Sequence, residues 1–259
     1  MNNQVPYPYV SEGEKKIPID DPSGKWSDLV LLPEWEEKYY DVYTVKKFGK
    51  WVMLKALKPE YKGIPEYEAM LHKEFDVRYN LCHPNIVMVN DLDEVPGVGL
   101  AIITDDVYGY SLRRLIDEKR LTPRIVHRLE TQLLDAIQYI QENHVQHVSL
   151  TPETIIFTEY NENLKLTNVG FDQSDYLSEQ DTRKDIAAYG RIINEVLDHL
   201  PANLPKLRKI AKKCEDNEHG YRTVADLQLD MERRSSSQLY IILCCFIVLM
   251  AIILVWLTL

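Results

Sequence analysis

The spacing of hydrophobic residues changes once along the chain and divides it into two parts. In the first part, short apolar runs bounded by turn residues predict strands, and one stretch predicts a helix. In the second part, apolar residues recur at intervals of three and four, as at Leu129, Leu133, Ile137 and Ile140, which predicts helices. Strands with one helix, followed by a helical half, indicate an α+β protein with two lobes.

The expected elements have definite bounds. Strands are expected at 28–32, 41–47, 51–57, 86–92 and 99–104, with the first helix at 65–81. Later helices are expected at 111–118, 122–143, 183–200, 203–216 and 223–233, and a β-hairpin at 155–158 and 164–167. Thr122-Pro123 supports one helix start, since it combines an N-cap residue with proline at the first helical position. Residues 1–26 are rich in proline and charge, and we expect them to be extended or disordered.

The end of the sequence is apolar throughout. Residues 239–259, LYIILCCFIVLMAIILVWLTL, carry no charged side chain and are long enough to cross a bilayer as a helix. A buried core helix is a poor alternative, because a helix apolar on every face needs protein on all sides. Arg233 and Arg234 precede this segment, so the positive-inside tendency places the preceding domain in the cytoplasm. We therefore expect a linker at 235–238 and a single-pass C-terminal membrane anchor.

Charge and cysteine content narrow the classes of partner. Thirty Lys and Arg residues stand against forty Asp and Glu residues, which gives a formal net charge of −10. Nucleic-acid binding requires a concentrated basic face, and no basic run in the chain is long enough, so we expect no nucleic-acid partner. The four cysteines show no CxxC spacing and indicate neither a zinc site nor a disulfide framework.

Several short motifs follow one another between residues 27 and 233. They are VMLKAL at 52–57, HPNIV at 83–87, IITDD at 102–106, HVSLTPETIIF at 147–157, LKLTNVGF at 164–171 and DIAAYGRIINEVL at 185–197. Together they resemble the protein-kinase family, which implies a bilobal fold with an N-lobe at 27–105 and a C-lobe at 106–234. The resemblance also implies that Lys55 would hold ATP phosphates, that Glu74 would pair with Lys55, and that Thr104 is the gatekeeper.

The departures from this family fall on positions that phosphoryl transfer requires. Ser149 replaces the catalytic Asp, and a neutral hydroxyl cannot act as that base near pH 7. Thr151 replaces the loop Lys, and Thr154 replaces the Asn that holds one magnesium ion. Asn168 replaces the Asp that holds magnesium most directly, and an amide oxygen binds this cation more weakly than a carboxylate does.

Two longer segments also depart from the family. Residues 33–40, PEWEEKYY, stand where a glycine-rich loop would cover the phosphates, yet they contain no glycine. Glu34, Glu36 and Glu37 would repel a polyphosphate there. Residues 171–184 contain no A-P-E sequence and leave little chain for a platform that could hold a substrate peptide.

Two hypotheses from different classes follow. The first is a catalytically inactive pseudokinase, without a metal site or a required cofactor, that acts as a scaffold or allosteric module by binding protein partners at the membrane. The second is an unorthodox Ser/Thr kinase, in which displaced acids such as Asp172 replace the lost metal ligand. The role of Lys55 and Glu74 stays open, since they could hold ATP without magnesium or form only a structural ion pair.

Overall fold

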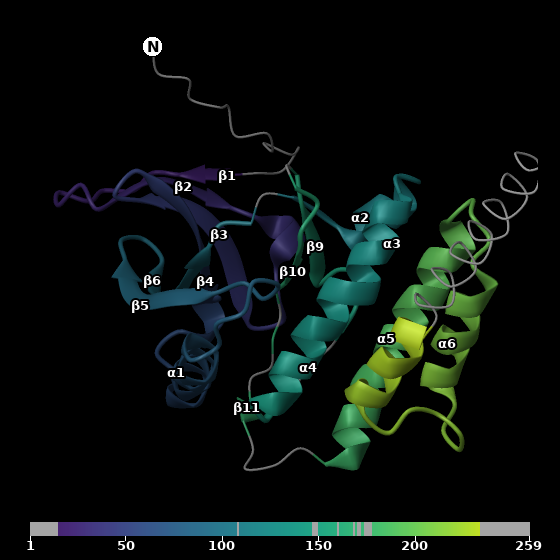
Figure 1. The fold of residues 1–259 in the computed structure, drawn as a ribbon. Coiled ribbons are helices and arrows are strands. Elements are labelled where there is room, and N and C mark those ends of the chain that lie inside the picture. The colour runs from purple at the N-terminus through teal and green to yellow at the C-terminus, as the bar shows by residue number, and fades with distance from the viewer. Residues whose placement is uncertain are drawn as a thin grey trace, which may run out of the picture.

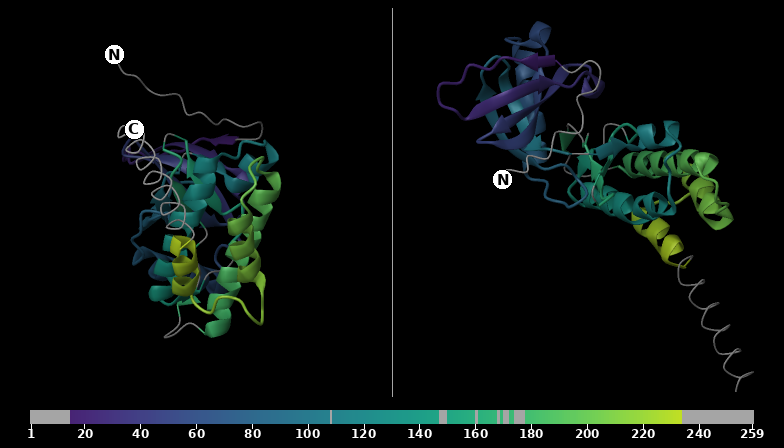
Figure 2. Two further views of the ribbon diagram at one scale, coloured as in Figure 1. Left: turned by 45° about the vertical axis from the view of Figure 1, so that its right-hand side comes forward. Right: turned by 90° about the horizontal axis from the view of Figure 1, so that it is seen from above.

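The computed structural model describes residues 15–107, 109–146, 150–159, 161–167, 169, 172–173 and 178–233. These residues form two lobes, a small one built around a sheet and a larger one built mainly from helices (Figure 1). The right-hand view in Figure 2 shows the same division, with the sheet at one side and the long helices at the other. The prediction of an α+β protein with two lobes is confirmed.

The small lobe contains an antiparallel sheet. Its strands, within the described residues, are β1 (Lys15–Ile17), β2 (Trp26–Leu31), β3 (Tyr40–Lys47), β4 (Lys50–Leu57), β5 (Val89–Val95) and β6 (Gly99–Asp105), in the order β1-β2-β3-β4-β6-β5. The turn between β3 and β4 places Phe48 and Gly49 at positive φ, as a tight two-residue hairpin requires. The strand expected at 86–92 begins only at Val89, because Ile86 instead forms a bridge to Leu166 of the large lobe.

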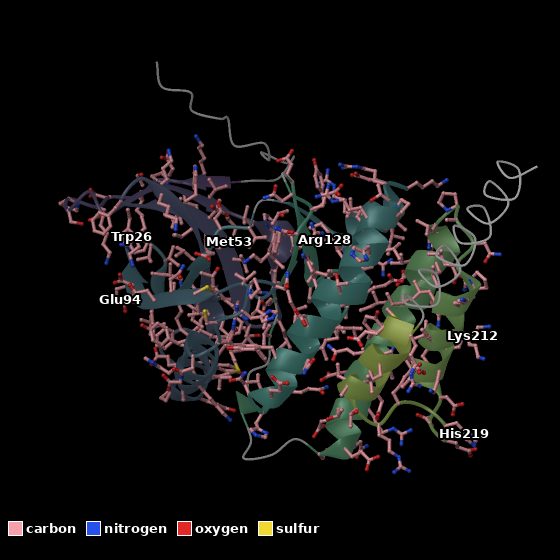
Figure 3. The ribbon with its side chains drawn as sticks, in the orientation of Figure 1. Trp26, Met53, Glu94, Arg128, Lys212 and His219 are labelled. Atoms are coloured by element: carbon pink, nitrogen blue, oxygen red, sulfur yellow. The ribbon has the colours of Figure 1, made fainter. Side chains whose placement is uncertain are left out.

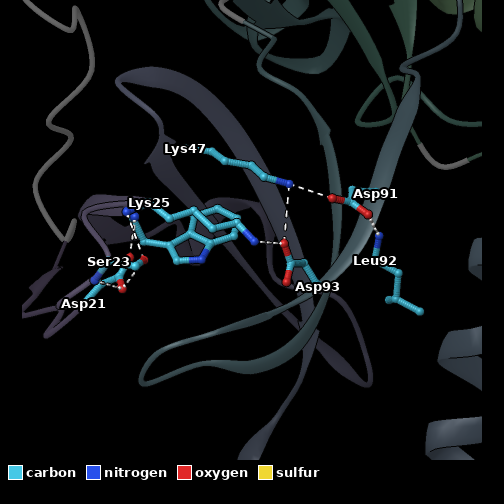
Figure 4. Close-up of polar contacts among 8 residues, drawn as sticks. Asp21, Ser23, Lys25, Lys47, Asp91, Leu92 and Asp93 are labelled. Atoms are coloured by element: carbon cyan, nitrogen blue, oxygen red, sulfur yellow. Dashed lines mark hydrogen bonds and ion pairs between the residues drawn. The ribbon is translucent and has the colours of Figure 1, made fainter.

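An ion-pair network connects distant strands of this sheet. Lys25, just before β2, contacts Asp93 of β5 (Figure 4). The Nζ atom of Lys47, at the end of β3, lies 2.6 Å from Asp91 Oδ2 and 3.5 Å from Asp93 Oδ2. Strands that are not neighbours in the sheet approach each other here because the sheet is twisted and curved. Trp26 is buried on the inner side of this curve, within one of the two small-lobe cores.

One helix, α1 (Pro65–Tyr79), packs against the sheet. Leu71, Glu74 and Arg78 lie on its buried face, because residues three or four positions apart share one side of a helix. Leu71 packs with Leu57 of β4 and Ile102 of β6 in the second small-lobe core. The apolar contacts of α1 therefore hold Glu74 beside Lys55 of β4.

The large lobe consists mainly of helices. They are α2 (Leu112–Asp117), α3 (Pro123–Arg128), the π-helical turn η3 (Leu129–Leu133), α4 (Leu134–Glu142), α5 (Glu179–His199), α6 (Pro205–Glu215) and a helical stretch at 224–233. The helix expected at 122–143 is confirmed as the continuous run α3, η3 and α4, interrupted only by its π-helical turn. As expected, the Thr122 hydroxyl caps it by accepting a hydrogen bond from the backbone N–H of Ile125.

Short strands line the junction between the lobes. β9 (Ile155–Thr158) pairs with β10 (Leu164–Leu166), which confirms the predicted hairpin. β7 (Gly109–Ser111) pairs with the other edge of β9. β8 (Val145–Gln146) pairs with β11 (Asp172–Gln173). The residues that connect β6 to β7 lead from the small lobe to the large one.

The expected membrane span, 239–259, and the linker at 235–238 lie outside the described residues, as do residues 1–14. Among the residues that the structure does describe, no helix combines the length and apolar character needed to cross a membrane.

Candidate functional site

Lys55 lies in β4 on the face of the sheet opposite the small-lobe core that contains Trp26. Side chains alternate between the two faces of a strand, and Val52, Leu54 and Ala56 pack in the core with Trp26. Lys55 therefore shares the opposite face with Met53, which Figure 3 shows on the side of the small lobe near the helices. Lys55 is only 6% exposed, so its ammonium group requires polar partners within the protein.

Two carboxylates supply these partners. The Nζ atom of Lys55 lies 2.8 Å from Glu74 Oε1 of α1 and 2.7 Å from Glu37 Oε2 of the segment before β3. The same oxygen of Glu74 accepts a hydrogen bond from Arg78 Nη1 at 2.7 Å. Arg78 Nη2 also donates to the backbone oxygen of Thr167 in the large lobe at 3.3 Å. Glu37, Lys55, Glu74 and Arg78 thus form a chain of alternating charge whose formal sum is zero.

The ring of Tyr40 packs against this charged chain. Its centroid lies 4.4 Å from Lys55 Nζ, which is the geometry of a cation–π contact. Burial, followed by the negative charge of Glu74, raises the pKa of the Tyr40 hydroxyl above its ordinary value. Tyr40 therefore stays neutral at physiological pH and adds no charge to the site.

Residues 33–39 connect β2 to β3 and lie between the two lobes. They include the short turn η1 (Pro33–Trp35), which Figure 1 shows in purple beside β9 and β10. The indole of Trp35 packs against Val87, Val107 and Ile156. Because Val107 belongs to the connection between lobes and Ile156 to β9, Trp35 reaches from the small lobe to the large one.

Thr151 and Thr154 occupy two of the replaced catalytic positions, and hydrogen bonds connect them within their own loop. Thr154 Oγ1 donates to the backbone oxygen of Thr151 at 3.0 Å and accepts from the backbone N–H of Thr151 at 3.3 Å. Thr167 Oγ1 donates to the backbone oxygen of Thr154 at 3.1 Å. The hydroxyl of Thr154 therefore stabilises the local turn.

Polar contacts connect α5 to α4 and to the loop that contains Thr151 and Thr154. Asp185 is half-buried, and its Oδ2 accepts a hydrogen bond from Gln141 Nε2 of α4 at 3.2 Å. Burial raises the pKa of Asp185 to about 6, and the bond from Gln141 offsets only part of that effect. Arg113 of α2 lies 2.8 Å from Glu153 and 2.6 Å from Glu195 of α5, so it links the loop at Thr151 to the helical core.

Several residues singled out in the sequence lie outside the described part of the chain. They are Ser149 and Asn168, and the side chain of Asp172. Among the described residues, no cluster of three or more His, Cys, Asp or Glu side chains could hold a metal ion. The structure brings Lys55 and Glu74 together, in the pairing that the family resemblance implies.

The sequence alone did not indicate that Trp35, Arg78 and the pairing of Glu37 belong to the site. Arg78 had a usable signal, because it follows Glu74 by four residues and must lie beside it on a helix. Glu37 was interpreted only as a repulsive charge, since nothing in the local sequence shows that its segment turns toward β4. Trp35 had no signal either, because its contacts come from distant parts of the chain.

Comparison with known families agrees with this architecture. The family model described as "Protein kinase domain" matches residues 38–199, which is more than half of the chain. The chain therefore belongs to the protein kinase domain family.

Individual relatives match over limited regions. The human serine/threonine-protein kinase ULK3 is 27% identical over 52% of this chain and 28% of its own length. The serine/threonine-protein kinase PkaA of Streptomyces coelicolor is 33% identical over 43% of this chain and 20% of its own length. The chain thus spans less than a third of these relatives. The crystal structure of the Mycobacterium tuberculosis PknI kinase domain has a TM-score of 0.57 at 18% identity, covers 78% of this chain and 93% of the PknI chain, and supports the fold.

Proposed function

We propose that this chain is a pseudokinase, a protein kinase domain that binds other proteins at a membrane and does not transfer phosphate. The observation that carries the proposal is the bonding of Thr154, whose hydroxyl both donates to and accepts from the backbone of Thr151. In protein kinases this position carries the Asn that holds one magnesium ion. A threonine hydroxyl that is bonded into its own turn is a poor substitute for that ligand.

The other replacements support the same proposal. Ser149 lacks the negative charge that would accept a proton from a substrate hydroxyl. Asn168 offers magnesium an amide oxygen where the family uses a carboxylate. Because the base and both metal positions are changed together, no single retained residue can supply the missing chemistry.

The matches to serine/threonine kinases favour one alternative, an unorthodox kinase that transfers phosphate from ATP. We expect instead that the purified full chain transfers no phosphate from labelled Mg-ATP to itself or to a general protein substrate. Incorporation should equal the background of a Lys55→Ala variant. Incorporation above that background, lost in Lys55→Ala, would contradict the pseudokinase proposal and support the alternative.

We also propose that residues 239–259 anchor the domain, with 27–234 on the cytoplasmic side. The full chain should sediment with membranes and resist alkaline extraction, whereas a chain truncated after residue 234 should stay in the supernatant. Leu249→Arg should weaken insertion, because an arginine at the centre of a span costs about 2.5–3.5 kcal/mol on insertion scales. Leu239→Arg is the matched control, since a charge at the interface is tolerated. Equal membrane retention of the truncated chain would contradict the anchor.

A further inference from the structure

The chain itself fills the region between Lys55 and the connection of the two lobes. We refer to residues 33–39 as the plug loop. We propose that the plug loop occupies the cleft between the two lobes in place of a bound ligand. Trp35 takes the position of a ligand's aromatic ring, and Glu37 takes the position of a ligand's anionic group. The two contacts come from one loop and reach two separate parts of the cleft.

The first contact balances the positive charge of Lys55 with a second carboxylate. Glu37 Oε2 lies 2.7 Å from Lys55 Nζ, and Glu74 lies at 2.8 Å from the same atom. Glu74 in turn pairs with Arg78, so both buried cations already have carboxylate partners. A polyphosphate that approached Lys55 would meet two carboxylates at short range and would be repelled unless Glu37 moved away.

The second contact fills the apolar part of the cleft. Trp35 packs against Val87, Val107 and Ile156, which come from the segment before β5, the connection between lobes and β9. These three residues are buried, and the indole packs against the apolar surface that a flat ring would need. A ligand with an aromatic ring must therefore displace Trp35.

Hydrogen bonds on both sides hold the plug loop in this position. Leu32 N donates to Val42 O at 2.9 Å, and Glu37 N donates to Tyr40 O at 3.0 Å. On the outer side, Lys58 N donates to Tyr39 O at 3.0 Å, and the Lys58 ammonium group pairs with Glu36. A loop with a side chain at every position and these backbone contacts is suited to occupy space, whereas a glycine-rich loop leaves room for phosphates.

ATP, which the kinase family implies, therefore does not fit beside the plug loop. Carboxylates balance the charge of Lys55, and Trp35 covers the apolar surface. Ligand binding therefore requires the plug loop to move, and the ligand must supply the free energy of that change. This inference rests on the proposed function because it assigns a means of regulation to the same cleft. Its measurement is binding, however, and not phosphate transfer.

Two substitutions separate the halves of the plug. We expect the full chain in detergent micelles to bind adenosine, tripolyphosphate and ATP only weakly in calorimetric titrations without magnesium. Trp35→Ala should tighten adenosine binding by at least about tenfold and leave tripolyphosphate unchanged. Glu37→Ala should tighten tripolyphosphate binding by at least about tenfold and leave adenosine unchanged. Combined, they should tighten ATP binding about a hundredfold if the effects add.

Glu66→Ala is the control, because it removes the same charge from an exposed side chain of α1 that lies outside the plug loop. It should leave binding of all three probes unchanged. If the Glu37→Ala variant does not fold, Glu37→Gln keeps the side-chain shape and should still tighten tripolyphosphate binding. A folded double variant without any gain, or the same gain in Glu66→Ala, would overturn the plug.

The outcomes also separate this inference from the proposed function. A wild-type chain that binds ATP as tightly as the double variant, without transferring phosphate, overturns the plug and leaves the pseudokinase proposal intact. A double variant that gains ATP binding and then transfers phosphate supports the plug and overturns the pseudokinase proposal.

Discussion

Glu74→Ala is expected to lower the free energy of unfolding by about 3–5 kcal/mol, the usual cost of removing one partner from a buried ion pair. Glu74 is fully buried, and one of its oxygens contacts both Lys55 and Arg78. Its loss removes the carboxylate that Arg78 contacts and one of the two carboxylates that Lys55 contacts. Urea unfolding of the full chain in detergent micelles, followed by tryptophan fluorescence, measures the effect.

Asp76→Ala provides the control for this prediction. Asp76 lies on the same helix and carries the same charge, but its side chain is exposed. Its removal should change the free energy of unfolding by no more than about 0.5 kcal/mol. A similar small change in Glu74→Ala would show that the charged chain does not contribute to stability.

The second large effect is expected at the contact between α5 and α6. Gly190 lies within α5, and a Cβ atom added there would be 2.6 Å from Cys214 Cβ and 2.7 Å from the backbone oxygen of Ala211. Gly190→Val must therefore push α6 away from α5, and overpacking of this kind costs about 1–3 kcal/mol or more. We expect a loss of about 3 kcal/mol in the same urea experiment, because two of the obstructing atoms cannot rotate away.

The adjacent position tests whether this effect is specific to the helix contact. Arg191 is exposed on α5, so Arg191→Ala should leave the free energy of unfolding within about 0.5 kcal/mol of the wild type. Gly190→Ala should fall between the two, since alanine favours the helix by about 1 kcal/mol over glycine but still meets α6. A Gly190→Val chain as stable as the wild type would mean that the two helices do not pack as described.

The elements that the sequence predicted well are those whose spacing is set by local geometry. β3 and β4 are short runs rich in apolar residues that a two-residue turn separates, and α5 repeats apolar residues at intervals of three and four, so each pattern favours one backbone conformation. The short strands β7, β8 and β11 were not predicted, whereas the equally short β10 was predicted as half of a hairpin. The three missed strands are too short to show a period, and their pairing partners lie far away in the sequence.

The candidate site divides in the same way. The sequence by itself determined which chemical groups are present, including Lys55, Glu74 and the replacements at Ser149, Thr154 and Asn168, because these depend on residue type and order along the chain. Only the tertiary structure decided that Glu37 contacts Lys55 and that Trp35 lies against the connection between lobes. These contacts depend on how a loop without its own periodic pattern folds back between two lobes, and that path is set by packing among residues far apart in sequence.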